Sequence, residues 1–296
     1  MTAKASFLRA LWLMSGSLTF SGSLFAAEPV GEHLTDAQPP LGVLPVAPDA
    51  LVDPRMARSW GTLPARRFWA TTVDVGFVYL RPRLSFGYGR PFTEWIGLDA
   101  NPIATTNGLG LYGGGRIEIP HMDLRVGPRY FSSFSHTYQP TQASYSRLDI
   151  EGNSGAKART LTYEAELDLS FGMGPGVLLL RGSASYVTGV PKGESVFEET
   201  LHVMVDPPWV WRTRLAYVFT FGSRDQHSLG PAVDVLDVPK RGGTPTIRVG
   251  PILRLALSRR VDVRGSFIAT VRSPDSIGLV GGDFTELGVR YRWATE

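Results

Sequence analysis

Apolar and polar residues alternate with a period of two along this chain, from Phe68 almost to its end. The longest alternating stretch covers residues 209–221, and its apolar face carries Trp209, Trp211, Thr213, Leu215, Tyr217, Phe219 and Phe221. Arg212 and Arg214 lie on the opposite face. A period of two is typical of a β-strand with two unlike faces. About thirteen residues exceed the usual five or six of a strand and suffice to cross a bilayer at a tilt, so this stretch predicts a membrane-spanning strand.

Similar alternation elsewhere predicts eleven strands, the seventh of them weak, at residues 68–79, 84–88, 109–119, 124–131, 161–171, 178–186, 194–205, 209–221, 247–257, 261–271 and 285–293. Residues 90–106, 137–158 and 223–244 are interpreted as long connections that alternate with short turns. Short turns at one rim and long loops at the other are typical of an outer-membrane barrel, which takes an even number of strands. We therefore expect an all-β, closed antiparallel transmembrane β-barrel with up-and-down order. Twelve strands, with one more before Phe68, are preferred to ten.

The faces of these strands divide into two sets of residues. The apolar set predicts a lipid-facing surface that includes Trp209, Trp211, Leu215, Tyr217, Phe219, Phe221, Tyr291 and Trp293. The polar set predicts a lumen lined by Asp74, Arg116, Glu118, Arg125, Arg129, Glu164, Glu166, Asp168, Arg181, Arg212, Arg214, Arg248, Arg254, Asp262, Arg264, Glu286, Arg290 and Arg292. Three successive inward carboxylates, Glu164, Glu166 and Asp168, would be costly in a dry core, so this face must be wet or matched by cations.

The predicted lumen holds eleven arginines and seven carboxylates. In a water-filled lumen this excess would favour anions that pass or bind. Alternatively, arginine and carboxylate groups pair across a narrow lumen and close it. The choice depends on the lumen width, and therefore on the strand number.

The N-terminal part of the chain has a different character. Residues 1–27 carry Lys4 and Arg9, an apolar stretch and Ala26-Ala27, a layout that predicts a cleaved signal peptide for export to the bacterial outer membrane; a retained anchor helix is the alternative. Residues 28–66 contain seven prolines and predict a disordered periplasmic leader, which could act as a tether, a partner-binding arm or a plug. Residues 67–296 would form the barrel.

Composition narrows the possible functions. The chain has 296 residues with 33 Gly and 22 Pro, which favours turns over long helices. With no Cys, disulfides and thiol chemistry are excluded. No segment after the predicted signal offers 18 consecutive apolar residues. Removing Lys4 and Arg9 with the signal lowers the net charge from +3 to +1, and the absence of a polybasic run argues against nucleic-acid binding.

Three smaller motifs were weighed. Pro128 and Pro251 follow the same tripeptide, Arg-Val-Gly, in the middle of outward strand faces, which suggests bulges or kinks, or a chance recurrence. Residues 108–113 match G-x-G-x-x-G, but no helix is expected after them, so the glycines more simply reduce bulk in the wall. Among five scattered histidines, His136 is the strongest candidate for catalysis, yet no acid lies near it in sequence. We therefore expect no enzyme activity, metal or cofactor.

The chain resembles Gram-negative outer-membrane β-barrel proteins over residues 68–293. In that class the final strand ends in an aromatic residue that the barrel-assembly machinery recognises, and Leu287, Val289, Tyr291 and Trp293 fit this pattern, although Ala294 to Glu296 extend past it. Residues 81–89 are also similar to myxobacterial barrels, some of which belong to gliding-motility machinery. The resemblance implies the lipid bilayer and the assembly machinery as partners. Periplasmic proteins could bind residues 28–66.

These observations favour a passive pore for small, preferentially anionic solutes. The first alternative is a closed-lumen structural anchor for an envelope-spanning motility or secretion machine. An outer-membrane hydrolase is the third and least favoured hypothesis.

Overall fold

The structure is a computed structural model that describes residues 64–76, 79–151, 155–222, 226–258, 260–284 and 287–295. Every described residue belongs to one compact unit, Val43–Glu296. The predicted signal (residues 1–27), most of the predicted leader and Glu286 lie outside the described residues.

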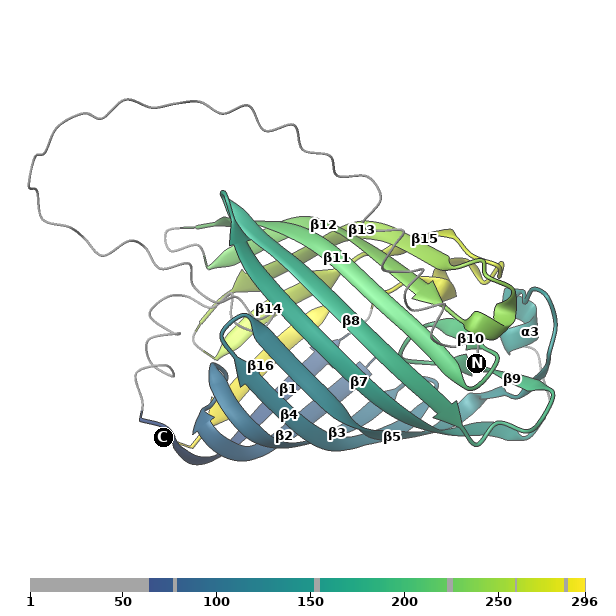
Figure 1. Ribbon diagram of the computed structural model, residues 1–296, viewed down its shortest axis with the longest axis horizontal. Helices are drawn as coiled ribbons and strands as arrows, with labels where there is room; N and C mark the ends of the chain where they lie inside the picture. Colours follow the sequence, from purple (N-terminus) through teal and green to yellow (C-terminus); the bar gives the residue numbers. More distant parts are fainter. Residues whose placement is uncertain are drawn as a thin grey trace, which may run out of the picture. The chain divides into compact units, whose positions relative to one another are not determined.

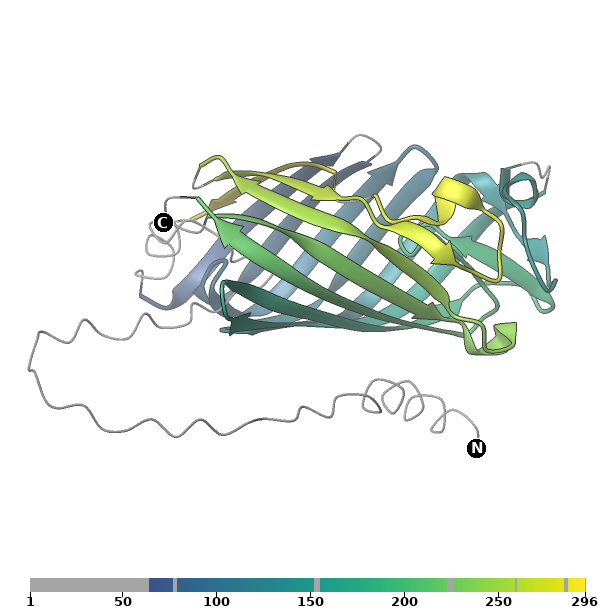
Figure 2. The same cartoon turned by 90° about the horizontal axis from the view of Figure 1, so that it is seen from above.

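The described chain forms a closed antiparallel β-barrel of 12 strands in up-and-down order, so the predicted fold class and strand number are confirmed (Figures 1 and 2). The wall strands are β1 (Arg66–Gly76), β2 (Tyr79–Arg90), β3 (Glu94–Thr105), β4 (Gly108–Ile119), β5 (Met122–Thr137), β7 (Lys157–Met173), β8 (Gly176–Thr188), β11 (Trp209–Phe221), β12 (His227–Asp237), β13 (Thr246–Ala256), β14 (Val261–Ser266) with β15 (Ala269–Arg272), and β16 (Gly288–Ala294). Because β14 and β15 both pair with β13, they are two pieces of one wall strand. Pairing of β1 with β16 closes the barrel.

Alternation of side chains explains why these segments become wall strands. On β2, Leu84, Phe86 and Tyr88 are 53%, 41% and 57% exposed on the outer face, whereas the alternating residues Arg83 and Ser85 are buried. The same contrast recurs around the barrel, with apolar side chains outside and charged or small ones inside. The barrel thus reverses the arrangement of a water-soluble core, as a lipid-facing wall requires.

Two wall strands were wrongly interpreted as parts of long connections. Residues 90–106 contain β3, and residues 223–244 contain β12. The alternation of β3 is obscured because the bulky Trp95 lies on the inner face and Pro102 on the outer one. In β12 the Gly230-Pro231 pair has the same effect, since both residues usually signal a turn.

The weak predicted strand at residues 194–205 is not part of the wall. It forms β9 (Glu194–Glu198) and β10 (Val203–Val205), an antiparallel hairpin that pairs with the short β6 (Gln139–Pro140) in a separate sheet. Hereafter this hairpin, residues 194–205, is called the plug. The extra strand expected before Phe68 is also wrong, because the barrel closes directly through β1 and β16.

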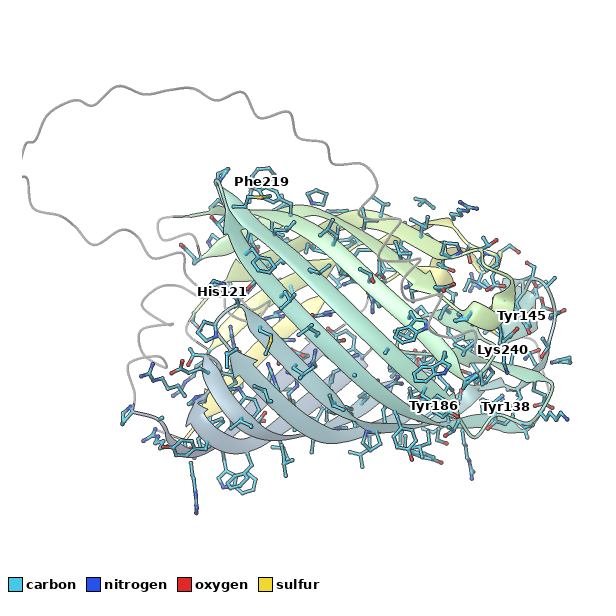
Figure 3. The ribbon with its side chains drawn as sticks, in the orientation of Figure 1. His121, Tyr138, Tyr145, Tyr186, Phe219 and Lys240 are labelled. Atoms are coloured by element: carbon cyan, nitrogen blue, oxygen red, sulfur yellow. The ribbon has the colours of Figure 1, made fainter. Side chains whose placement is uncertain are left out.

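The two rims of the barrel differ. One rim carries only short turns together with the start of β1 and the end of β16. The other rim carries α3 (Arg147–Glu151), the plug, η1 (Pro239–Arg241) and η2 (Gly278–Gly281), and is called the loop rim. Figure 3 shows Tyr138, Tyr145 and Lys240 at the loop rim, and His121 and Phe219 toward the opposite end. The predicted separation of long loops from short turns is therefore largely correct, although the connections after β1 and β3 are short ones at the loop rim.

Neither mid-strand proline coincides with a register shift. Pro128 pairs with Tyr163 in register, and Pro251 faces Pro231. The irregularities lie elsewhere, between Ser132 and Thr137 and between Ile247 and Arg248. Pro251 does lie beside the break between β14 and β15, where its carbonyl accepts a hydrogen bond from the Phe267 amide. The bulge interpretation is therefore wrong.

The glycines of β4 lie in a strand with no helix after it, as the sequence suggested. A Cβ atom at Gly114 would overlap the Tyr112 hydroxyl, and one at Gly127 on β5 would overlap the backbone of Gly113. These glycines therefore let the Tyr112 ring lie flat against the inside of the wall.

Candidate functional site: the barrel lumen

The inner face of the wall carries the charged residues that the sequence assigned to the lumen, apart from Glu286, which is not described. They form short ladders of ion pairs between neighbouring strands, and few of them point at one another across the barrel. Three regions of this inner surface differ in charge and are considered in turn.

The first region, called the balanced wall, is the inner face of β5, β7 and β8. Arg181 binds Asp168 through two hydrogen bonds of 2.6 and 3.0 Å, and Arg125 pairs with Glu166. Arg129 donates to Glu164 at 2.9 Å. Three arginines thus face four carboxylates, Asp123, Glu164, Glu166 and Asp168, and Asp123 in turn binds Arg116 of β4 at 2.8 Å. The paired charges satisfy the inward carboxylates without an apolar core.

The second region, called the arginine wall, is the inner face of β14, β16, β1 and β2. Its members are Arg81, Arg83, Arg264, Arg290 and Arg292, with the two carboxylates Asp74 and Asp262. Asp74 accepts two hydrogen bonds from Arg290, and Asp262 is shared by Arg264 at 3.1 Å and Arg292 at 2.8 Å. Arg254 of β13 also binds Asp262, at 2.9 Å. The described arginine wall therefore holds five guanidinium groups and two carboxylates.

Arg81 stands apart within the arginine wall. In the part of the chain that the structure describes, it takes part in no salt bridge, and its Nε atom is buried without a hydrogen-bond partner. Its guanidinium lies 5.3 Å from the centre of the Tyr79 ring, a cation–π arrangement. A buried cationic donor without a partner is costly unless a water or an anion occupies the space beside it.

The third charged cluster lies on β11, β12 and β13. Asp234 of β12 binds Arg212 through two hydrogen bonds of 2.8 and 2.9 Å, and it lies 3.5 Å from Arg248 of β13. Asp283, from the connection before β16, enters the lumen and accepts hydrogen bonds from Arg212 and Arg214. The backbone of Asp283 is held by Ile268 through hydrogen bonds of 2.8 and 3.1 Å.

An internal cavity of about 220 Å³ lies between these regions. The charged residues that line it are ten arginines and five carboxylates: Arg81, Arg83, Arg125, Arg129, Arg181, Arg212, Arg214, Arg254, Arg264 and Arg290, with Asp123, Glu164, Glu166, Asp168 and Asp283. The described lining thus carries an excess of five positive charges, and the arginine wall supplies four of the ten arginines.

Part of the cavity lining is apolar. Leu179 of β8, Ala216 and Val218 of β11, and Ile252 of β13 contact the cavity. Leu179 and Ile252 both pack against the cluster formed by Val177 and Val218, and the four cavity-lining side chains are called the apolar patch. Ile252 is two residues from Arg254, which lies opposite Arg264 in the ladder between β13 and β14, so the apolar patch borders the arginine wall.

The plug crosses the lumen at the loop rim. Its Glu198 accepts a 2.5 Å hydrogen bond from Arg129 on β5. On the far side, Arg248 of β13 donates two hydrogen bonds of 2.8 Å to the carbonyls of Leu201 and His202. Since β5 and β13 are five strands apart in a ring of 12, the plug is held from nearly opposite sides of the barrel.

Apolar packing fixes the plug further. Its residues Val196, Leu201, Val203 and Val205 are buried against wall residues near the loop rim, namely Ala158, Val187, Val210 and Leu236. Burial acts to raise the pKa of Glu198, but the Arg129 charge and hydrogen bonds from Arg129 and Thr200 outweigh burial, so the pKa of Glu198 is lowered. The carboxylate therefore stays ionised and paired well into the acidic range.

His136 is buried beside the plug. Its Nδ1 atom lies 3.1 Å from Glu199, and its ring packs edge to face on Phe197 with 5.0 Å between ring centres. Glu199 also accepts a 2.6 Å hydrogen bond from Asn107. The sequence could not place this acid near His136, because the two residues meet only when the plug folds inward. Within the described ranges, no three His, Cys, Asp or Glu residues form a metal-binding group.

The residues assigned to the lipid-facing surface lie on the outer face. Phe219, Phe221 and Leu215 are 51%, 42% and 41% exposed. Trp211 stacks on Trp209 with 5.4 Å between ring centres, and Tyr217 donates a 2.8 Å hydrogen bond to the Met173 carbonyl. Tyr291 and Trp293 are also exposed on the outside, at the end of the closing strand. Outer aromatic residues thus gather toward both rims, as in the girdles of membrane barrels.

Sequence reasoning missed several lumen residues: Arg81, Arg83, Asp99, Asp123, Glu198, Glu199, Asp234 and Asp283. Asp99 and Asp234 belong to the two unrecognised strands, whose alternation could have revealed them. Arg81 and Arg83 were read as a turn because Pro82 lies between them. Glu198, Glu199 and Asp283 come from connections that fold into the lumen, and no local pattern marks that.

No known protein family matches this chain in a scan of family profiles, and a search of curated proteins finds no significant relative. None of the described helices is long and apolar enough to cross a membrane.

Proposed function

We propose that this chain is an integral outer-membrane barrel that conducts small anionic solutes, with the plug as its gate. The exposed apolar belt and the aromatic residues near both rims support membrane insertion. The observation that carries the solute preference is the cavity lining, in which ten arginines face five carboxylates. Fixed positive charge in a narrow, low-dielectric lumen concentrates anions and repels cations.

The gating part of the proposal comes from the plug. Two charged anchors, Arg129 and Arg248, hold it across the lumen, so with the plug docked the pathway at the loop rim is narrow. Plug displacement would widen this pathway without any change to the wall, whose ladders are separate from the plug sheet.

The test is conductance in planar bilayers. Folded mature protein, with its heat-sensitive gel mobility as the proof of folding, is inserted and measured in a tenfold KCl gradient. The expected result is a small discrete conductance whose reversal potential favours chloride, and a larger one when residues 194–205 are replaced by a short Gly-Ser linker. Silence from both forms, or a preference for potassium, would reject the pore.

A closed structural anchor is the second candidate, and the plug with its paired walls is the observation that favours it. It predicts periplasmic proteins that co-purify with the full chain and are lost when residues 28–66 are deleted. Export by a cleaved signal stays a prediction, which N-terminal sequencing of the mature protein would test. A role like that of motility-associated barrels also stays a prediction, which the deletion of residues 28–66 would test.

A further inference from the structure

The lumen cavity combines two surfaces that a simple anion pore does not need together. On one side lies the arginine wall, with Arg81 lacking a described carboxylate partner and its buried Nε atom unbonded. Beside it lies the apolar patch, formed by Leu179, Ala216, Val218 and Ile252. A lumen that passed only hydrated ions would gain nothing from an apolar surface at the cavity.

We propose that this cavity is a binding site for a small amphipathic anion, whose acidic group contacts Arg81 and Arg290 and whose apolar body lies on the apolar patch. The inference rests on the proposed anion pathway and names the class of solute that it takes. An aliphatic or aromatic carboxylate fits this description better than an inorganic ion.

The positions of the residues support one ligand that contacts both surfaces. Arg81, Arg264 and Arg290 line the main cavity and also a small adjoining pocket that Asp74 and Tyr79 complete. Ile252 and Leu179 line the same main cavity and pack against the cluster of Val177 and Val218. The cavity volume of about 220 Å³ limits the ligand to a small molecule.

Chemistry explains the expected preference. A planar guanidinium binds a carboxylate through two parallel hydrogen bonds, which is stronger and more directional than a contact with chloride. Each methylene that leaves water for the apolar patch adds about 0.8 kcal/mol, which corresponds to about a fourfold increase in affinity. Hexanoate has four more methylenes than acetate, so even partial burial should give it at least about a tenfold advantage.

The test uses the full folded protein in lipid nanodiscs and isothermal titration calorimetry with sodium hexanoate, sodium acetate and hexylammonium chloride. Empty nanodiscs correct for partition of the probes into lipid. The expected result is saturable hexanoate binding with a negative heat-capacity change, at least about tenfold weaker acetate binding, and no hexylammonium binding. Equal affinities for hexanoate and acetate, or binding of hexylammonium, would overturn the proposal.

Two variants separate the two surfaces. Arg81→Gln should weaken both carboxylates about tenfold, whereas Val218→Thr, which preserves side-chain shape, should weaken hexanoate alone. Arg147→Gln is the matched control, because Arg147 lies on the exposed α3 helix and should leave binding unchanged. If neither Arg81→Gln nor Val218→Thr changes hexanoate binding in protein that retains its heat-sensitive mobility, the assigned site is wrong.

Bilayer conductance and hexanoate binding together distinguish failure of the ligand proposal from failure of the proposed pore. Protein that binds hexanoate but is silent in planar bilayers would retain the binding site and reject conduction. Protein that conducts chloride but does not distinguish hexanoate from acetate would retain the pore and reject the amphipathic ligand.

Discussion

The balanced wall and the arginine wall face each other across the same lumen, yet they differ in the ratio of arginines to carboxylates. On β5, β7 and β8, three arginines meet four carboxylates in short ladders. On β14, β16, β1 and β2, five arginines accompany two described carboxylates, and three of the five bind them. Closely paired charges hold strands together and cancel each other's electrostatic potential. An excess of one sign instead produces a net potential that attracts a solute of the opposite charge. Under the proposed function, the balanced wall would supply structural rigidity and the arginine wall would recognise the solute.

The largest effect is expected from Asp168→Ala in the balanced wall. This change leaves the partly buried Arg181 without its two-hydrogen-bond partner, which should lower the free energy of unfolding by about 2–3 kcal/mol. Urea unfolding in lipid vesicles, followed by tryptophan fluorescence, measures the loss. Glu151→Ala is the control, because Glu151 forms an exposed pair and should change stability by less than about 1 kcal/mol. If both variants lose less than about 1 kcal/mol of unfolding free energy, the balanced wall does not stabilise the barrel.

The next effect concerns the attachment of the plug to the balanced wall. The pKa of Glu198 is lowered below its ordinary value of 4.5, so the pair with Arg129 contributes its full stability above that value and loses it as the pH falls through the lowered pKa. Conductance should therefore stay low from pH 7 to about pH 5 and rise only in stronger acid. Glu198→Gln should already show the raised conductance at pH 7. A rise that begins above pH 5 would point to a different titrating group.

A smaller effect is expected from reversed charge on the arginine wall. The double change Arg81→Glu and Arg83→Glu replaces an excess of positive charge by negative charge beside Asp74, so the preference for chloride should fall several-fold and turn toward potassium. Reversal potentials in a KCl gradient measure the change. Arg90→Glu, at the end of β2 in an exposed pair with Glu94, is the control that should retain chloride preference. Unchanged ion selectivity in the double variant would show that the arginine wall does not set the preference for anions.

The smallest effect on stability is expected from a neutral substitution in the arginine wall. Arg81→Gln removes a cation that has no described salt bridge, so the free energy of unfolding should change by less than about 0.5 kcal/mol or increase slightly. The same urea unfolding assay applies. A loss as large as that of Asp168→Ala would show that Arg81 is structural after all.

The sequence predicted the wall where side-chain alternation was regular. Residues 209–221 were expected to form one strand with its arginines inside, and β11 has those bounds. Alternation failed where Trp95 faces inward on β3 and where Gly230-Pro231 interrupts β12, because size and backbone preference there override the polar pattern. The total of twelve strands was nevertheless correct, because the two missed strands, β3 and β12, were offset by the false strand at residues 194–205 and by the one misplaced before Phe68.

The lumen was harder to predict than the wall. Arg125 and Arg181 could be assigned inward from phase alone, but their partners depend on strand register, which the sequence did not give. The contact between Arg129 and Glu198 joins residues 69 positions apart through a loop that folds inward, and local patterns carry no information about such a contact. Consequently the position of the plug at the loop rim and the cavity could not be predicted from the sequence.

The seam between β1 and β16 has a consequence for biogenesis. Asp74 and Arg290, which are 216 positions apart, meet across this seam, so the barrel cannot close until the ribosome has delivered its final strand. Until then the chain carries two open edges whose unpaired amides and carbonyls invite pairing with other chains. A truncation before Gly288 should therefore yield aggregates in place of a smaller barrel.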